Sequence, residues 1–277
     1  MGDNEQQAEG KRPGPISAYF ERVGRTTIVG IEEIGFAGTL FVEGLYWIIM
    51  GRRRAQPVRM GSIVLEMMEM GVRAIPIVAV MSGTIGIMLA IQGIHTLKIF
   101  GAESKVVLGV ALSVTREFAP LITGILVAGR SGSALAARLG TMRISQEVDA
   151  LRVMGINPVR YLVVPPLVAA VTMVPCLTIM ADLVGIAGAG FYVWLDLGMS
   201  FPAYINNTLD ALSADDVLHG LGKSLLFAIL ITLVGVANGA TVKGGAEGVG
   251  KVTTRSVVQG ISAIIVTDMI FAFLLTR

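Results

Sequence analysis

The sequence is poor in charge, cysteine and histidine, and each shortage excludes a class of function. Only 15% of its 277 residues are charged, against about 25% in a typical soluble domain. A net charge of +2 gives no reason to expect a nucleic-acid partner. The single cysteine, Cys176, cannot form an internal disulfide. The two histidines, His95 and His219, lack the spacing of metal ligands, so we expect no metal site.

Long apolar runs are abundant instead. The chain is 53% hydrophobic, and a membrane-spanning helix needs about 20 mostly apolar residues. The third of the runs that meet this requirement is interrupted by Pro165, Pro166 and Pro175. We therefore predict an all-α integral membrane protein with five transmembrane helices. The predicted spans are residues 74–97, 106–128, 162–195, 221–240 and 256–275.

The chain before these spans divides into two further regions. Residues 1–27 are polar and rich in Gly and Glu, and we predict a largely disordered tail. Residues 28–60 contain an apolar helix pattern that carries Glu32, Glu33 and Glu43, each costly at the centre of a bilayer. An amphipathic helix in the membrane interface accounts for this pattern better than a sixth span. Residues 61–277 form the predicted five-helix membrane domain.

Basic residues give the orientation of the predicted spans. With the N-terminus in the cytoplasm, residues 1–73, 129–161 and 241–255 are the inner segments, and they hold 17 of the 22 Lys and Arg residues. Because basic residues concentrate on the cytoplasmic side, we predict a cytoplasmic N-terminus and a periplasmic C-terminus.

The inner segment between the second and third spans begins with the stretch GRSGSALAARLGTMRISQEVDALRVMG from Gly129. Apolar residues recur at helical spacing first around Leu135 and again around Leu151. Ser145 resembles a helix start, because acidic residues follow it. We predict two short helices at the membrane surface within residues 129–160, presented to a cytoplasmic partner.

Charged residues inside the predicted spans are the strongest candidates for a functional site. Arg116 and Glu117 lie within the second span, and Asp268 lies in the outer half of the fifth. Such residues normally line a cavity or pair with one another. Two interpretations remain open: a polar patch where Arg116 attracts a phosphate and Asp268 or Glu117 tunes or gates it, or a structural Arg–Asp bridge between helices. Asp182, in the third span, either lines the same pathway or makes a packing hydrogen bond.

Two further predictions concern residues around this patch. A pathway for a substrate with an apolar part also needs an apolar lining, for which the candidates are Met81, Ile85, Met88, Leu89 and Leu112. Glycines in the first span, Gly83, Gly86 and Gly93, are expected to permit close helix contact. The sequence Gly220-Leu221-Gly222-Lys223-Ser224 only resembles the end of a phosphate-binding loop, because no apolar strand precedes it. We therefore expect Lys223 to extend its charge toward the outer interface.

The motifs around these charges resemble the permease subunit of the Mla-type phospholipid transporters, the MlaE family. The resemblance covers roughly residues 60–277. It is carried by Thr115-Arg116-Glu117, Pro120, Ala128-Gly129-Arg130-Ser131-Gly132-Ser133-Ala134, Gly140-Thr141-Met142, Gln146, Asp149-Ala150-Leu151, Met154, Asn157-Pro158, Pro165, Thr253-Thr254-Arg255 and Asp268.

The resemblance implies a non-catalytic permease subunit of an ABC transporter that moves phospholipid between the inner and outer membranes of a bacterium. ATP and Mg²⁺ would bind to a separate ATPase subunit, and no cofactor is expected on this chain. A second copy of the chain, a periplasmic MCE-domain lipid-binding protein and a STAS-domain accessory protein would complete the assembly. The segment between spans two and three would be a cytoplasmic coupling helix. Its expected contact residues are Gly129, Arg130, Ser131, Ala134, Arg138, Met142, Glu147 and Asp149.

Two other classes of function remain open at this point. An ion-gradient-driven secondary transporter or channel could use Arg116, Glu117 and Asp268 as a relay, although inverted repeats, which would favour this class, are not visible. A structural membrane anchor has no use for intramembrane charge. The long central motif favours the ABC permease.

Overall fold

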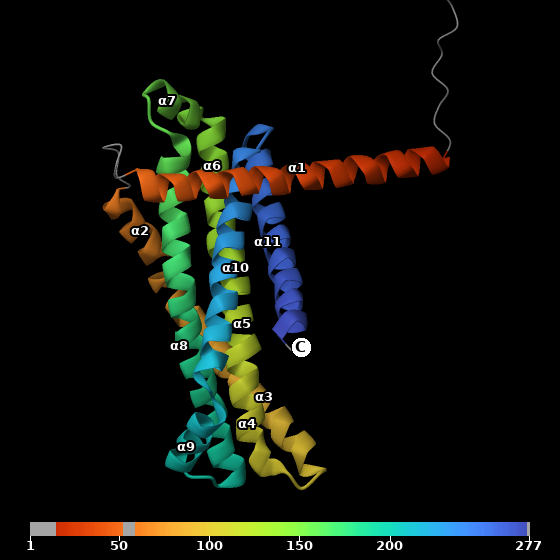
Figure 1. Ribbon diagram of the computed structural model, residues 1–277, viewed down its shortest axis with the longest axis vertical. Coiled ribbons are helices and arrows are strands. Elements are labelled where there is room, and N and C mark those ends of the chain that lie inside the picture. The colour runs from red at the N-terminus through yellow and green to blue at the C-terminus, as the bar shows by residue number, and fades with distance from the viewer. Residues whose placement is uncertain (1–14, 52–58, 276–277) are drawn as a thin grey trace, which may run out of the picture. The chain divides into compact units, whose positions relative to one another are not determined.

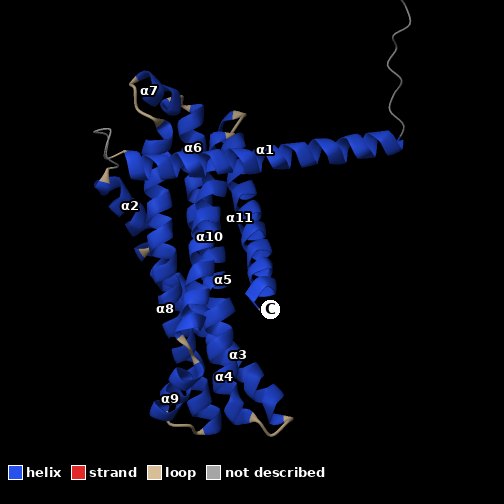
Figure 2. Cartoon of the chain, viewed as in Figure 1, coloured by secondary structure: helices blue, strands red, loops and turns tan. Residues whose placement is uncertain are grey.

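The computed structural model describes residues 15–51 and 59–275, and every regular element among them is a helix (Figure 2). The chain divides into two units, residues 1–39 and 40–277, and helix α1 runs from the first into the second. The α-helices are α1 Pro15–Met50, α2 Met60–Met70, α3 Ile75–Lys98, α4 Val106–Ser113, α5 Ala119–Val127, α6 Ser133–Ile144, α7 Glu147–Val153, α8 Val164–Leu197, α9 Phe201–Ala211, α10 Ala214–Ala240 and α11 Gly245–Leu275. The short turns are η1 Val72–Ala74, η2 Glu103–Lys105, η3 Val114–Phe118, η4 Ala128–Gly132 and η5 Val159–Val163.

Among the described residues, six helical segments are long and apolar enough to cross a membrane, and the protein is an all-α, multi-pass membrane protein. Five of them cover the predicted spans, apart from residue 275 at the end of the fifth: residues 60–98, 103–144, 159–197, 214–240 and 245–274. The sixth, Gly30–Met50, belongs to α1. Its interfacial placement stays a prediction, since length and composition alone also allow it to span.

The first unit contains the N-terminal part of α1. This helix begins at Pro15, so the prediction of a disordered tail over residues 1–27 is wrong for residues 15–27. Proline is well suited to the first turn of a helix, where its missing N–H is not needed, and no further proline follows before Met50. Residues 1–14 lie outside the described residues.

Within the second unit, the last turns of α1 contact the start of α8. Asn157 donates a hydrogen bond from Nδ2 to Glu43 Oε1 at 2.9 Å. The Arg160 guanidinium carbon lies 5.6 Å from the centroid of the Trp47 ring, and Gly44 lies against Leu167. These contacts join α1 to the segment that links α7 with α8, and they satisfy the Glu43 carboxylate, which the sequence alone marks as costly.

The helix α8 forms much of the second unit's core. It packs against α2, α3, α5 and α10, while α7 and α9 lie near its opposite ends (Figure 1). The sequence suggested that three prolines would interrupt this helix, but the helix is continuous through all of them. Pro165 and Pro166 lie in its first turn, and Pro175 lies inside a helix that continues to Leu197. The π-helical turn η5 runs into α8 without a break, so all three prolines lie in one continuous helical run from Val159 to Leu197.

Glycines hold α3 and α8 in direct backbone contact, as predicted for α3. A Cβ added to Gly86 would overlap the backbone of Gly185, and one on Gly188 would lie 2.6 Å from Gly83 O. Ser82 Oγ donates a hydrogen bond across the same interface to Ala181 O at 2.6 Å. Small residues of this kind allow membrane helices to approach closely enough for extensive van der Waals contact.

The end of α8 is closed by the short helix α9. Tyr204 is buried, and its hydroxyl donates a hydrogen bond to Ile186 O at 2.9 Å. Gly190 makes room for the ring, since a Cβ there would lie 2.6 Å from Tyr204 Cε1. Burial raises the pKa of Tyr204 to about 12, so this phenol stays neutral and keeps donating at ordinary pH.

Candidate functional site

A π-helical turn places the two charges of the second span. The turn η3 covers Val114–Phe118 and joins α4 to α5 without a break. A π turn inserts one extra residue into an α-helix, and such turns are frequent at functional sites. Neighbouring positions on a helix point about 100° apart. Arg116 and Glu117, adjacent in sequence, accordingly find different partners.

Arg116 pairs with Asp216, in the first turn of α10. Its Nε donates to Asp216 Oδ1 at 2.5 Å, and its Nη2 contacts the same oxygen. The other oxygen, Oδ2, accepts hydrogen bonds from Ser213 N and Ser213 Oγ, both at 2.8 Å, in a capping box that begins α10. Asp216 therefore both caps a helix and holds the guanidinium.

Lys223 lies at the centre of the second ionic group. Its Nζ is 2.5 Å from Glu117 Oε2 and 3.0 Å from Asp268 Oδ1, which joins η3, α10 and α11. The Lys223 side chain is fully buried, so the prediction that it extends toward the outer interface is wrong. The two carboxylates favour an internal position, because pairing compensates the loss of hydration. We call Arg116, Glu117, Asp216, Lys223 and Asp268 the charged cluster.

The charged cluster corrects the expected bridge between Arg116 and Asp268. Arg116 pairs with Asp216, and Asp268 pairs with Lys223. Sequence reasoning missed Asp216 and Lys223, although their spacing of seven residues puts them on one face of α10. His219 lies between them on the same helix, with its ring centroid 6.1 Å from that of Phe271.

The charged cluster is closed on one side and open on the other. Lys223 and Asp216 are at most 3% exposed, whereas the Arg116 and Glu117 side chains are 48% and 40% exposed. The open side thus presents a guanidinium and a carboxylate, and the buried members hold both in place. This arrangement suits binding of a group that carries a phosphate, since Arg makes strong paired hydrogen bonds to phosphate oxygens.

Asp182 and the apolar candidates lie elsewhere. Asp182 is buried in α8, and its Oδ1 has no hydrogen-bond partner among the described residues. Met81 and Met88 are exposed on α3, which packs against α4, α5 and α8, whereas η3, α10 and α11 build the charged cluster. The other α3 candidates, Ile85 and Leu89, are partly exposed on the same helix. Leu112 lies on α4, one turn before Arg116.

The predicted coupling segment contains one separate short helix rather than two. The first apolar set belongs to α6, which continues the second span through the π-helical turn η4 and buries Leu135 and Leu139 against α10 and α11. Only α7 stands apart, after Gln146 in a left-handed conformation at φ 61°. Gln146, and not Ser145, directly precedes this helix. A periodic pattern cannot distinguish a new helix from the end of a long one.

The expected contact residues fall into three groups. Gly129, Arg130 and Ser131 lie in η4, where Arg130 Nη1 is buried without a hydrogen-bond partner in the described part of the chain. Ala134, Arg138 and Met142 lie on α6, and Arg138 Nη2 is 2.5 Å from Glu66 Oε1 of α2. Glu147 and Asp149 lie on α7 and are exposed.

The surface of α7 combines charge with exposed apolar side chains. Asp149 Oδ1 accepts from Arg143 at 3.0 Å and from Arg152 at 3.2 Å. Next to these ion pairs, Val153 is 88% exposed, and Met154 is also exposed. Sequence reasoning singled out the acidic residues here and missed Val153. An apolar side chain this exposed beside a charged rim is typical of a protein contact.

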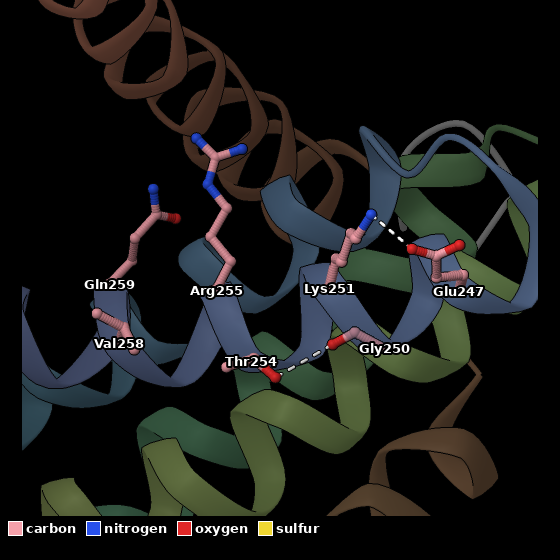
Figure 3. Close-up of a pocket in the computed structure, with 7 residues that line it drawn as sticks. All are labelled: Glu247, Gly250, Lys251, Thr254, Arg255, Val258 and Gln259. Carbon is pink, nitrogen blue, oxygen red and sulfur yellow. Dashed lines mark hydrogen bonds and ion pairs between the residues drawn. The ribbon is translucent and has the colours of Figure 1, made fainter.

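The first turns of α11, which pack near α6, carry a further group of charged and polar side chains. Glu247, Lys251, Arg255 and Gln259 project from this part of α11 (Figure 3). Lys251 Nζ lies 2.7 Å from Glu247 Oε1, and Gln259 Oε1 accepts from Asn238 Nδ2 at 2.7 Å. The motif at residues 253–255 is therefore on the same helix as Asp268, nearer its other end.

Comparison with known proteins gives consistent matches. Residues 63–274 match the family Permease MlaE. A probable ABC transporter permease protein of Rickettsia prowazekii is 32% identical over 250 residues, which cover 88% of this chain and 96% of that protein. The intermembrane phospholipid transport system permease protein MlaE of Haemophilus influenzae is 30% identical over 259 residues, covering 92% and 96%. The chloroplastic protein TRIGALACTOSYLDIACYLGLYCEROL 1 of Arabidopsis thaliana is 34% identical over 202 residues, covering 73% and 58%.

Proposed function

The chain belongs to the MlaE family of ABC transporter permeases, and on this premise we propose that it provides the membrane pathway for phospholipid transport between the inner and outer membranes of a bacterium. The observation that carries the proposal is the half-open charged cluster within an otherwise apolar helix bundle. Charge in a membrane segment that faces neither solvent nor a partner is costly. Its open side therefore needs a cavity that holds water or a polar ligand.

A second copy of the chain is the proposed cover for this cavity. Arg116 and Glu117 are nearly half exposed in the isolated chain, and lipid tails cannot solvate them. Two copies that face each other across the cluster would shield both charges from lipid and enclose the substrate headgroup. Arg116 would bind the phosphate, while Glu117, fixed by Lys223, would limit how far an anionic group can enter.

The energy for transport would come from a separate ATPase subunit. The exposed helix α7 supports this assignment, because it presents Val153 and Met154 beside an ionic rim. The chain itself is proposed to be non-catalytic, with ATP and Mg²⁺ held by that partner. A periplasmic MCE-domain protein and a STAS-domain protein are the further proposed partners. The proposed location is the inner membrane, with the N-terminus in the cytoplasm and the C-terminus in the periplasm.

The first experiment is to tag the full chain, extract it in several mild detergents, and identify copurifying proteins by mass spectrometry. We expect an ABC ATPase and an MCE-domain protein. Recovery of the chain alone in every detergent would contradict the coupling assignment. The purified assembly, reconstituted in vesicles with fluorescent phospholipid, then tests the substrate. ATP-dependent lipid movement supports the proposal. ATP hydrolysis that is neither stimulated by phospholipid nor accompanied by lipid movement contradicts it.

A further inference from the structure

A groove lies between α2, α6 and the η5–α8 junction, apart from the charged cluster. Its volume is about 530 Å³, within the range of about 300–1,000 Å³ that is usual for small-ligand sites. We call it the α2 groove. Gly71, at the end of α2, lets this helix pack closely against α8, because a Cβ there would overlap the Met173 side chain. Pro165 and Pro166 form part of its wall.

Two acidic and two basic side chains line the α2 groove. Glu66 pairs with Arg138 at 2.5 Å, and Glu69 pairs with Arg73 at 3.3 Å. Glu66 is mostly buried, whereas Arg138 is nearly half exposed, and both members of the second pair are more than half exposed. The groove therefore offers cationic and anionic groups together, with no net charge among these four.

The remaining lining is apolar and is continuous with the outside of α2. Leu65 and Met68 line the groove and are 71% and 52% exposed. They belong to the apolar segment of residues 60–98, which is mostly unburied within the chain. Exposed apolar side chains of such a segment are suited to contact acyl chains, which would give lipid access to the groove.

Aromatic and basic side chains mark one edge of the groove as lying at headgroup depth. Tyr161 lines the groove, and the Arg59 guanidinium carbon lies 5.5 Å from its ring centroid. Tyrosine and arginine concentrate where a membrane meets water. The groove thus has a polar end at the interface and an apolar opening toward the acyl chains. A phospholipid has the same arrangement, with a polar headgroup at one end and apolar chains at the other.

We propose that the α2 groove binds a phospholipid with a zwitterionic amine headgroup, as a site separate from the transport pathway. The phosphate would accept hydrogen bonds from Arg138 and Arg73, and the ammonium would donate to Glu66 and Glu69. A primary ammonium has N–H donors for these carboxylates, and a trimethylammonium has none. An anionic headgroup without an amine would compete with Glu66 and Glu69 for the two guanidinium groups and offer these carboxylates no cation in exchange. The chemistry therefore favours phosphatidylethanolamine over phosphatidylcholine and phosphatidylglycerol.

This assignment gives Arg138 a role different from the ATPase contact expected from the sequence. The bound lipid would connect α2 to α6, the helix that leads into α7. The site does not depend on what the transporter carries, so it can be tested separately from the proposed function.

The test measures lipid retention on the full chain in its purified assembly by native mass spectrometry, after exchange into detergent with each of the three lipids. We expect the wild-type protein to retain phosphatidylethanolamine about tenfold better than phosphatidylcholine, in line with the loss of charge-assisted hydrogen bonds. The double variant Glu69→Gln with Arg73→Gln removes an exposed pair without threatening the fold, and it should lose most of this preference. The double variant Glu66→Gln with Arg138→Gln should abolish the remaining preference for phosphatidylethanolamine.

The matched control is Glu247→Gln with Lys251→Gln, which removes an even more exposed i,i+4 pair on α11 and should leave the preference unchanged. Equal retention of the three lipids by the wild-type protein would overturn the proposal. The proposal would also be overturned if Arg116→Gln abolished lipid retention while both groove variants kept it, because the lipid would then occupy the charged cluster. Loss of the ATPase with unchanged lipid retention in the groove variants would assign the groove to protein docking instead.

Discussion

The charged cluster and the α2 groove contain the same kind of contact in opposite surroundings. Lys223 meets Glu117, and Arg138 meets Glu66, both at 2.5 Å. Lys223 is fully buried and touches a second carboxylate, whereas Arg138 is 46% exposed. The distance between the cation and the carboxylate is thus the same in both pairs, but the exposure of the cation to water differs. Because the loss of hydration sets the cost of an unpaired charge, the two cations should respond very differently to substitution.

The largest effect should follow from Lys223→Met. This change leaves Glu117 and Asp268 close together without their shared cation. Removal of one partner from a buried ion pair typically costs about 3–5 kcal/mol, so we expect a clear fall in the thermal unfolding midpoint of the detergent-solubilised assembly, with loss of assembled protein.

A rescue experiment separates this effect from simple loss of packing. Combining Lys223→Met with Glu117→Gln and Asp268→Asn removes all three charges, and it should recover much of the lost stability. A triple variant as unstable as the single one would show that the shape of Lys223, rather than its charge, holds these helices together.

The next effect sharpens the contrast between the closed and open sides of the charged cluster. Arg116→Gln removes the exposed cation, while the capping hydrogen bonds of Asp216 remain. Loss of a charged hydrogen bond of about 1.5–3 kcal/mol to phosphate should slow lipid movement by about tenfold or more. Reconstituted vesicles with fluorescent phospholipid measure this rate.

Lys105→Gln is the matched control, because Lys105 is an exposed cation at the start of the same helical segment. We expect it to transport lipid at the wild-type rate. Equal transport by Arg116→Gln and the control would remove Arg116 from the substrate site.

Much of the fold was predictable, because apolar length reports membrane helices directly. The five spans, the close helix contact at the α3 glycines, and the occurrence of Arg116 and Asp268 within long apolar segments follow from residue type and spacing. The extent of the second helical segment did not, since apolar residues at helical spacing look the same in a new surface helix and at the end of a long one. The unbroken helix through η4 and the burial of Leu135 and Leu139 identify α6 as its continuation.

The charge pairing was beyond the reach of the sequence. Arg116 lies 100 residues from Asp216, and Lys223 lies 106 from Glu117, so no local spacing connects them. The π-helical turn at Val114–Phe118 also changes the direction in which each side chain points. A sequence pattern that assumes an ordinary α-helix does not anticipate this change. Lys223 looked like an interfacial residue because its two carboxylate partners come from other helices.

A smaller effect on stability but a large one on assembly should follow at α7. Val153→Asp places a charge at the exposed apolar position beside the ion pairs of Asp149. The isolated fold should barely change, because Val153 has few contacts to lose. If this side chain enters a pocket of the ATPase, recovery of that subunit in a pull-down should fall about tenfold, as for a central interface residue. Unchanged recovery would move the coupling contact away from this end of α7.

The smallest effect should come from Asp149→Asn, which breaks two ion pairs that are both largely exposed. Asp149 meets Arg143 at 3.0 Å and Arg152 at 3.2 Å, and each of the three side chains is more than a third exposed. Exposed pairs contribute about 0–1 kcal/mol, so the unfolding midpoint of the assembly should shift by no more than a few degrees. Raising the salt concentration should reduce even this shift, since mobile ions screen exposed charges. A loss as large as that of Lys223→Met would mean that α7 is buried in the assembly. Its ion pairs would then resemble those of the charged cluster, because a partner subunit would exclude water from them.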